Sequence, residues 1–105
     1  MTRDWVFSGF VARVGPGFVL DCVLDLGFGR FRPVRLWLSG VGLPSGEAER
    51  ERAMVFVGSW VDRGEREVVV RTVKEDGRYW GVFYQAGSER SLNDELLAEG
   101  HASAV

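Results

Sequence analysis

The chain has 105 residues, 46% of them hydrophobic, which is enough for one globular domain with a core of its own and leaves no room for a second. Its formal net charge is -2, which argues against the basic surface that most non-specific nucleic-acid binders use to release counterions from phosphates. No apolar stretch of about 18 residues occurs, and Met1–Asp4 lacks the basic-then-apolar order of a signal peptide, so we expect no membrane association and a cytoplasmic location.

The N-terminal third of the chain has the pattern of two consecutive strands. Trp5–Val14 is rich in aromatic and β-branched residues and ends at the turn signal of Gly15–Gly17. A second strand is expected over Phe18–Asp25, followed by a connection at Leu26–Gly29. Because Cys22 lies in the apolar part of this second strand and has no second cysteine to pair with, we predict a buried, structural thiol.

The third strand shows the clearest alternation in the sequence. Val34, Leu36 and Leu38 alternate with polar or aromatic neighbours. Successive side chains of a strand point to opposite faces, so the three aliphatic residues are predicted to face inward. Arg35 and Trp37 are then predicted to share the other face.

A change of period after the third strand predicts a helix. The Pro- and Gly-containing loop of Gly40–Gly46 is followed by Glu47–Val61, which begins with acidic residues where the helix dipole favours them. Apolar residues then recur at helical spacing, namely Ala53, Met54, Val57, Trp60 and Val61. We predict an amphipathic helix whose charged residues form its solvated face.

The C-terminal part predicts two more strands and a short helix. Strands are expected over Val68–Val73 and Tyr79–Tyr84, joined by a turn at Glu75–Gly77. A short helix is expected over Ser91–Gly100, with Ser91 as its N-cap and Gly100 suited to a left-handed exit. Five strands with a helix between the third and the fourth and a short C-terminal helix predict a mainly β (α+β) domain, a five-stranded OB-fold barrel over residues 1–105.

Several segments resemble the thermonuclease-like (staphylococcal nuclease-type) family of OB-fold proteins. The similar segments keep the order and spacing of that family and are distributed along nearly the whole chain: Ala12–Val14, Asp25–Gly29, Val34–Pro44, Asp76–Tyr79 and Ser91–Gly100. The resemblance implies the same barrel. It also implies a phosphodiesterase site in which carboxylates hold calcium, an acidic group lies near the attacking water, and two arginines stabilise charge on the phosphate.

The positions that carry this chemistry in the family are mostly replaced. By the resemblance, Phe18 and Gly42 stand where the two calcium-binding aspartates would be, Trp37 stands at the first arginine, and Ser45 stands at the catalytic glutamate. Arg78 alone matches a catalytic position. Calcium needs six to eight oxygen ligands, several of them from carboxylates, so we expect no calcium site, no other metal or cofactor, and no nuclease activity. His101 is the only histidine, lies in the C-terminal tail and is expected to be exposed.

We therefore expect a catalytically inactive, nuclease-like OB-fold domain that acts as an interaction module with a protein partner. The predicted surface consists of Phe18, Arg35, Trp37 and Arg78, because aromatic and arginine side chains are common interface anchors. One alternative is a single-stranded nucleic-acid-binding protein that stacks bases on the same residues. A second is that the aromatic side chains only fill the former cleft. A third is a calcium-dependent nuclease whose cleavage depends on Arg78.

Overall fold

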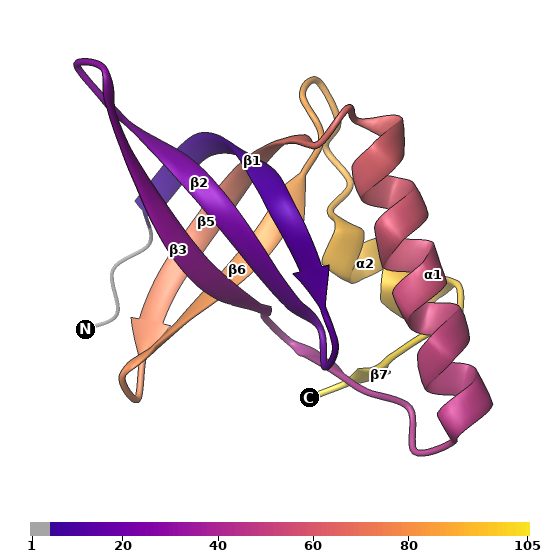
Figure 1. Cartoon of the computed structure of the whole chain (residues 1–105). Coiled ribbons are helices and arrows are strands. Elements are labelled where there is room, and N and C mark those ends of the chain that lie inside the picture. Colours follow the sequence, from indigo (N-terminus) through magenta and orange to yellow (C-terminus); the bar gives the residue numbers. More distant parts are fainter. Residues whose placement is uncertain (1–4) are drawn as a thin grey trace.

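The computed structural model describes residues 5–105, and its centre is a closed barrel of five strands in the order β1-β2-β3-β6-β5 (Figure 1). Neighbouring strands are antiparallel except β3 and β6, which are parallel. The predicted OB-type barrel is therefore confirmed. Met1–Asp4, where the sequence lacks a signal-peptide pattern, lies outside the described residues. The barrel strands are β1 (Trp5–Gly15), β2 (Val19–Gly27), β3 (Arg30–Leu38), β5 (Glu67–Glu75) and β6 (Arg78–Tyr84).

The two predicted helices are present, and a short strand pair accompanies them. Helix α1 (Glu47–Arg63) lies between the third and fourth barrel strands, and α2 (Leu92–Ala98) follows β6 and contacts both β6 and α1 (Figure 1). Two strands of two residues each, β4 (Val41–Gly42) and β7 (Ser103–Ala104), pair antiparallel and join the C-terminal segment to the chain after β3. In the described residues no helix is both long and apolar enough to cross a membrane.

Helix α1 closes one end of the barrel because its apolar side chains recur along one face. Ala53, Val57, Trp60 and Val61 are buried, as the helical spacing predicted, while Met54 is only partly buried. The indole Nε1 of Trp60 donates to Oε2 of Glu95 at 3.0 Å, so this large side chain enters the core without an unpaired N–H.

The inward faces of the strands fill the same end of the barrel. Leu36 and Leu38 are buried and Val34 is partly buried, whereas Arg35 is exposed on the opposite face, in agreement with the predicted alternation. Cys22 is buried as predicted, and burial raises the pKa of its thiol to about 12, so it stays protonated and unreactive near neutral pH.

The two tight hairpin turns use left-handed backbone with different residues. The β5–β6 turn has Asp76 and Gly77 at φ 53° and 74°, the type of pair that such turns favour. The β2–β3 turn has nearly the same angles, φ 55° and 73°, at Phe28 and Gly29. A bulky residue in this region costs about 1–2 kcal/mol because its Cβ approaches the following carbonyl.

A single buried amide ties α2 to the closing strands. The Asn93 side chain accepts a hydrogen bond from N of Phe83 at 3.1 Å. Its Nδ2 donates to the carbonyl oxygens of Ser39 at 2.7 Å and Gly81 at 3.1 Å. Asn93 therefore bridges β6 and the residue that follows β3, and its helix is positioned by Ser91, whose hydroxyl accepts from N of Asp94.

Replacement of Asn93 by alanine is expected to lower the free energy of unfolding by about 3 kcal/mol, because the buried backbone groups of Phe83 and Gly81 and the partly buried carbonyl of Ser39 lose a hydrogen-bond partner. Urea unfolding followed by tryptophan fluorescence measures the change. Glu89→Ala, on the exposed β6–α2 loop, is the matched control and should shift stability by less than about 0.5 kcal/mol. Equal effects of the two variants would contradict a structural role for the amide.

Candidate interaction surface

The structure separates the four residues predicted for a partner surface. Arg35 and Trp37 lie on the outer face of β3, and Arg78 begins β6 beside them. Phe18 is only 3% exposed and belongs to the hydrophobic core. The prediction that its ring lies on the partner surface is therefore wrong. Phe18 precedes the buried Leu20 and Cys22 by two and four residues, and this shared spacing is the sequence signal that could have predicted its burial.

Arg78 covers the aromatic part of the surface. Trp37 and Trp80 are neighbours across the parallel β3–β6 contact. The guanidinium carbon of Arg78 lies 4.3 Å from the ring centroid of Trp37 and 5.7 Å from that of Trp80. Such cation–π contacts contribute about 0.5–1 kcal/mol at exposed sites. A ligand that stacks on this face must therefore displace Arg78 or stack on its guanidinium plane.

An ion pair lies next to the aromatic group. The Nε of Arg35 donates to Oδ1 of Asp21 at 2.9 Å, with 58% and 30% of the two side chains exposed, so the pair is too well solvated to contribute much stability. This hydrogen bond, helped by the positive charges of Arg35 and Arg13, lowers the pKa of Asp21 below its usual value. The three residues line a hollow of about 250 Å³ between the β1–β2 turn and β3.

Strand register extends this face into an apolar row that the sequence analysis did not single out. On β2, Asp21 is paired with Arg13 and Arg35, and two residues further along Val23 lies between Phe10 of β1 and Pro33 of β3. Alternate residues of each strand share a face, so the charged row and the apolar row are neighbours on the outside of the barrel.

The apolar row continues toward the tip of the β2–β3 hairpin. Phe10 is 44% exposed and Phe31, which is paired with Asp25, is 62% exposed. Phe28 is fully exposed at the tip itself. Figure 1 shows this hairpin extending away from the helices. The alternation of Phe31 and Pro33 with the inward-facing residues of β3 is the sequence signal that could have predicted their exposure.

Other groups with reactive chemistry do not gather at this face. His101 is half-buried rather than exposed, because its ring contacts Phe56 of α1 with 4.8 Å between the centroids. Gly42, at a position where the resemblance implied a lost metal ligand, lies in the short strand β4. Among residues 5–105 no group of three or more histidine, cysteine, aspartate or glutamate side chains is placed to hold a metal ion.

Comparisons with known proteins found no family model, no curated protein and no solved structure that matches this chain. The resemblance to the thermonuclease-like family therefore stays a prediction from the segments quoted above.

The ion pair gives a pH-dependent prediction. Because the pKa of Asp21 is lowered in the folded chain, its carboxylate favours folding above the unfolded-state pKa, and this contribution is lost as the pH falls through the lowered value. In Arg35→Gln the pKa of Asp21 should rise toward 3.8, the ordinary value, as measured by a carboxyl-carbon NMR titration. Arg32→Gln, on the other face of the same strand, is the control. If neither variant changed the pKa of Asp21, the ion pair of Asp21 and Arg35 would be refuted.

Proposed function

We propose that this chain is a non-catalytic, nuclease-like OB-type domain that binds another protein through the outer face of β1–β3, the adjoining Arg78 of β6 and the tip of the β2–β3 hairpin. The binding face would extend from Trp37 and Arg78 at one end, past Arg35, to Phe31 and Phe28 at the other. The order of aromatic, charged and apolar rows is that of a protein interface, in which apolar and aromatic anchors lie beside arginine.

The observation that carries this proposal is Phe28. Its side chain is fully exposed, and its backbone adopts a left-handed conformation that costs free energy in a residue with a bulky side chain. The turn between β5 and β6 has nearly the same φ angles, but it consists of Asp76 and Gly77, residues that favour this conformation. Nothing in the fold accounts for phenylalanine at the hairpin tip. A partner that buries the ring does, since burial of a phenylalanine contributes about 1.5–3 kcal/mol.

The charges on the surface favour a protein over a polyanion. Asp21 pairs with Arg35, and Asp25 lies next to Phe31, so the outer face of β2 and β3 carries negative groups as well as a positive one. The whole chain carries a net charge of -2. A mixed charge pattern of this kind sets the register of a protein partner rather than attracting a phosphate backbone.

A single-stranded nucleic-acid-binding protein is the second candidate, because one observation favours it. Arg13, Arg35 and Arg78 lie with Trp37 and Trp80 on the outside of β1, β3 and β6. The face of the second and third strands is where OB folds bind oligonucleotides, with aromatic side chains for the bases and arginines for the backbone.

The protein-binding proposal is tested with Phe28→Asn, which places the favoured Asn-Gly pair in the turn. We expect unfolding free energy to rise by about 1 kcal/mol because strain is removed, and partner binding to fall at least tenfold because the anchor is lost. Affinity purification from lysate with the wild-type chain supplies the partner, and calorimetry on that partner gives Kd for each variant.

The control for Phe28→Asn is Val55→Ser, which removes another exposed apolar side chain, 65% exposed, from α1, away from the proposed surface. Its Kd should equal that of the wild type. Because Phe28→Asn is expected to be more stable than the wild type, loss of binding cannot be attributed to misfolding. An unchanged Kd in Phe28→Asn, or equal losses in the two variants, would refute the proposed surface.

The nucleic-acid candidate is tested by fluorescence polarisation of labelled single-stranded DNA and RNA, in calcium and in chelator, with probe length followed on a gel. On the leading proposal neither probe binds at 50 mM salt. Binding that weakens with salt and is lost in Trp37→Ala would instead support the second candidate. Calcium-dependent shortening of the probe that is lost in Arg78→Ala would restore the nuclease hypothesis.

A further inference from the structure

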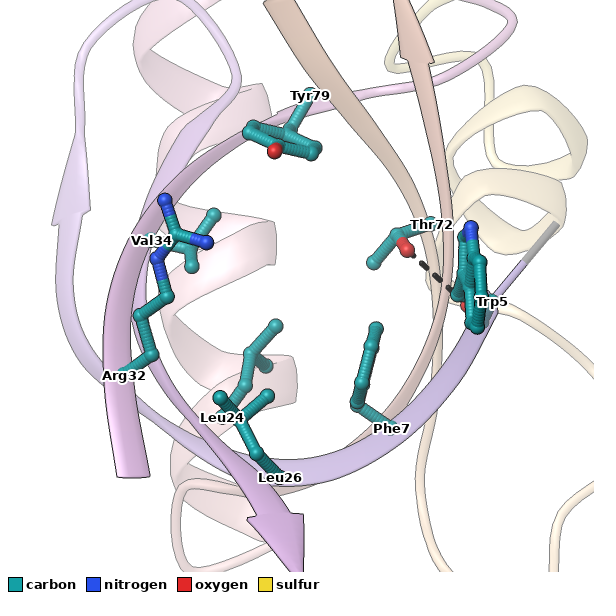
Figure 2. A pocket seen from close by; sticks show the side chains of 8 residues that line it. All are labelled: Trp5, Phe7, Leu24, Leu26, Arg32, Val34, Thr72 and Tyr79. Carbon is teal, nitrogen blue, oxygen red and sulfur yellow. Dashed lines mark hydrogen bonds between the residues drawn. The ribbon is translucent and has the colours of Figure 1, made fainter. Parts of the chain in front are cut away.

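The end of the barrel that α1 does not fill contains an open cavity of about 290 Å³. Figure 2 shows the side chains of its lining residues arranged around an open centre. They come from the parts of the five barrel strands that lie farthest from α1, on the inward face of each strand. The apolar and aromatic members of this lining are Trp5, Phe7, Leu24, Leu26, Val34 and Tyr79.

The floor of the cavity offers almost no hydrogen-bonding group. Leu24 and Thr72 are nearly fully buried there, and Phe7 and Val34 are partly buried. The hydroxyl of Thr72 already donates to the carbonyl oxygen of Trp5 at 3.1 Å, as the dashed line in Figure 2 marks. Water in this space would find few partners, so an apolar occupant is favoured over water.

The rim carries positive charge, and no acidic side chain is among the described residues that line it. Arg32 stands on the wall opposite Trp5 (Figure 2), and its guanidinium has no hydrogen-bond or ion-pair partner among residues 5–105. Lys74 does not line the cavity, but its Nζ lies 5.4 Å from the ring centroid of the lining residue Tyr79 and adds positive charge nearby. In a chain with a net charge of -2, a cationic rim around an apolar floor is complementary to an anionic head on an apolar body.

We propose that this cavity, which we call the barrel mouth, binds a small anionic amphiphile, an apolar body with one carboxylate that pairs with Arg32. The site is separate from the proposed protein surface, because alternate residues of β3 point into the barrel mouth and to the outer face of the barrel. The cavity has the volume of about ten water molecules in the liquid, which sets the size of the ligand at about ten non-hydrogen atoms.

Octanoate has this size and chemistry and serves as the probe, with octan-1-ol as its uncharged counterpart. Titration of the full chain is followed by amide NMR shifts. We expect saturable shifts centred on Phe7, Val34 and Thr72, and octanoate affinity about tenfold above that of octan-1-ol because of the charge-assisted pair with Arg32. Equal affinities for the two probes, the absence of saturable shifts, or shifts centred on Phe10 and Phe31 of the outer face would overturn the proposal.

Three variants complete the test. Arg32→Gln should reduce octanoate affinity about tenfold, to that of octan-1-ol, while Arg35→Gln, on the outer face of the same strand, should not change it. Leu26→Trp, at the partly exposed edge of the mouth, should weaken both probes by filling the space. Phe28→Asn should leave octanoate binding intact, which separates this proposal from the protein surface. Equal octanoate affinities in Arg32→Gln and Arg35→Gln, or full binding in Leu26→Trp, would refute the barrel mouth as the site.

Discussion

Closure of the barrel depends on a short parallel contact between β3 and β6 that one buried amide supports. Trp37 lies opposite Trp80 in this contact, and Asn93 donates to carbonyl oxygens on both sides of it. Gly81 in this contact leaves no room for a side chain, because a Cβ on this residue would lie 2.9 Å from Cγ2 of Val70 and 3.0 Å from the ring of Phe83. A short parallel pairing supplies few ladder hydrogen bonds, so the side-chain amide provides bonds that the strands do not make for themselves.

Once the barrel is closed, the alternation of each strand divides its residues between two environments. On β3, Arg35 and Trp37 face outward and take part in the surface with Arg78, whereas Arg32 and Val34 line the barrel mouth. One strand therefore contributes to two places with different chemistry, a mixed outer face and an apolar cavity with a cationic rim. Because the two sets are separated by parity, substitutions on β3 can be chosen to affect one without the other.

The tip of the β2–β3 hairpin combines left-handed backbone with full exposure of a bulky residue, whereas Phe18, left-handed at φ 59°, is buried. Natural sequences are locally consistent with their folds, and exceptions gather at functional sites. Asp76 and Gly77 follow this rule in the β5–β6 turn, and Phe28 departs from it in the β2–β3 turn. By contrast the ion pair of Asp21 and Arg35 obeys ordinary surface electrostatics, and its exposure limits what it contributes to stability. Strain and exposure together make the hairpin the stronger functional indicator.

The sequence by itself determined the elements, since they depend on local periodicity and end signals. The five barrel strands, α1, the N-cap at Ser91 and the outward position of Arg35 all follow from patterns within a few residues. The position of Phe18 was missed because the family resemblance, not its parity with buried neighbours, was used to assign it. Three features were visible only in the tertiary structure: the contact of the Arg78 guanidinium with the ring of Trp37, the pairing of β4 with β7, and the open barrel mouth. Each of these depends on residues far apart in the chain that barrel closure brings together, and no local period encodes the distance between them.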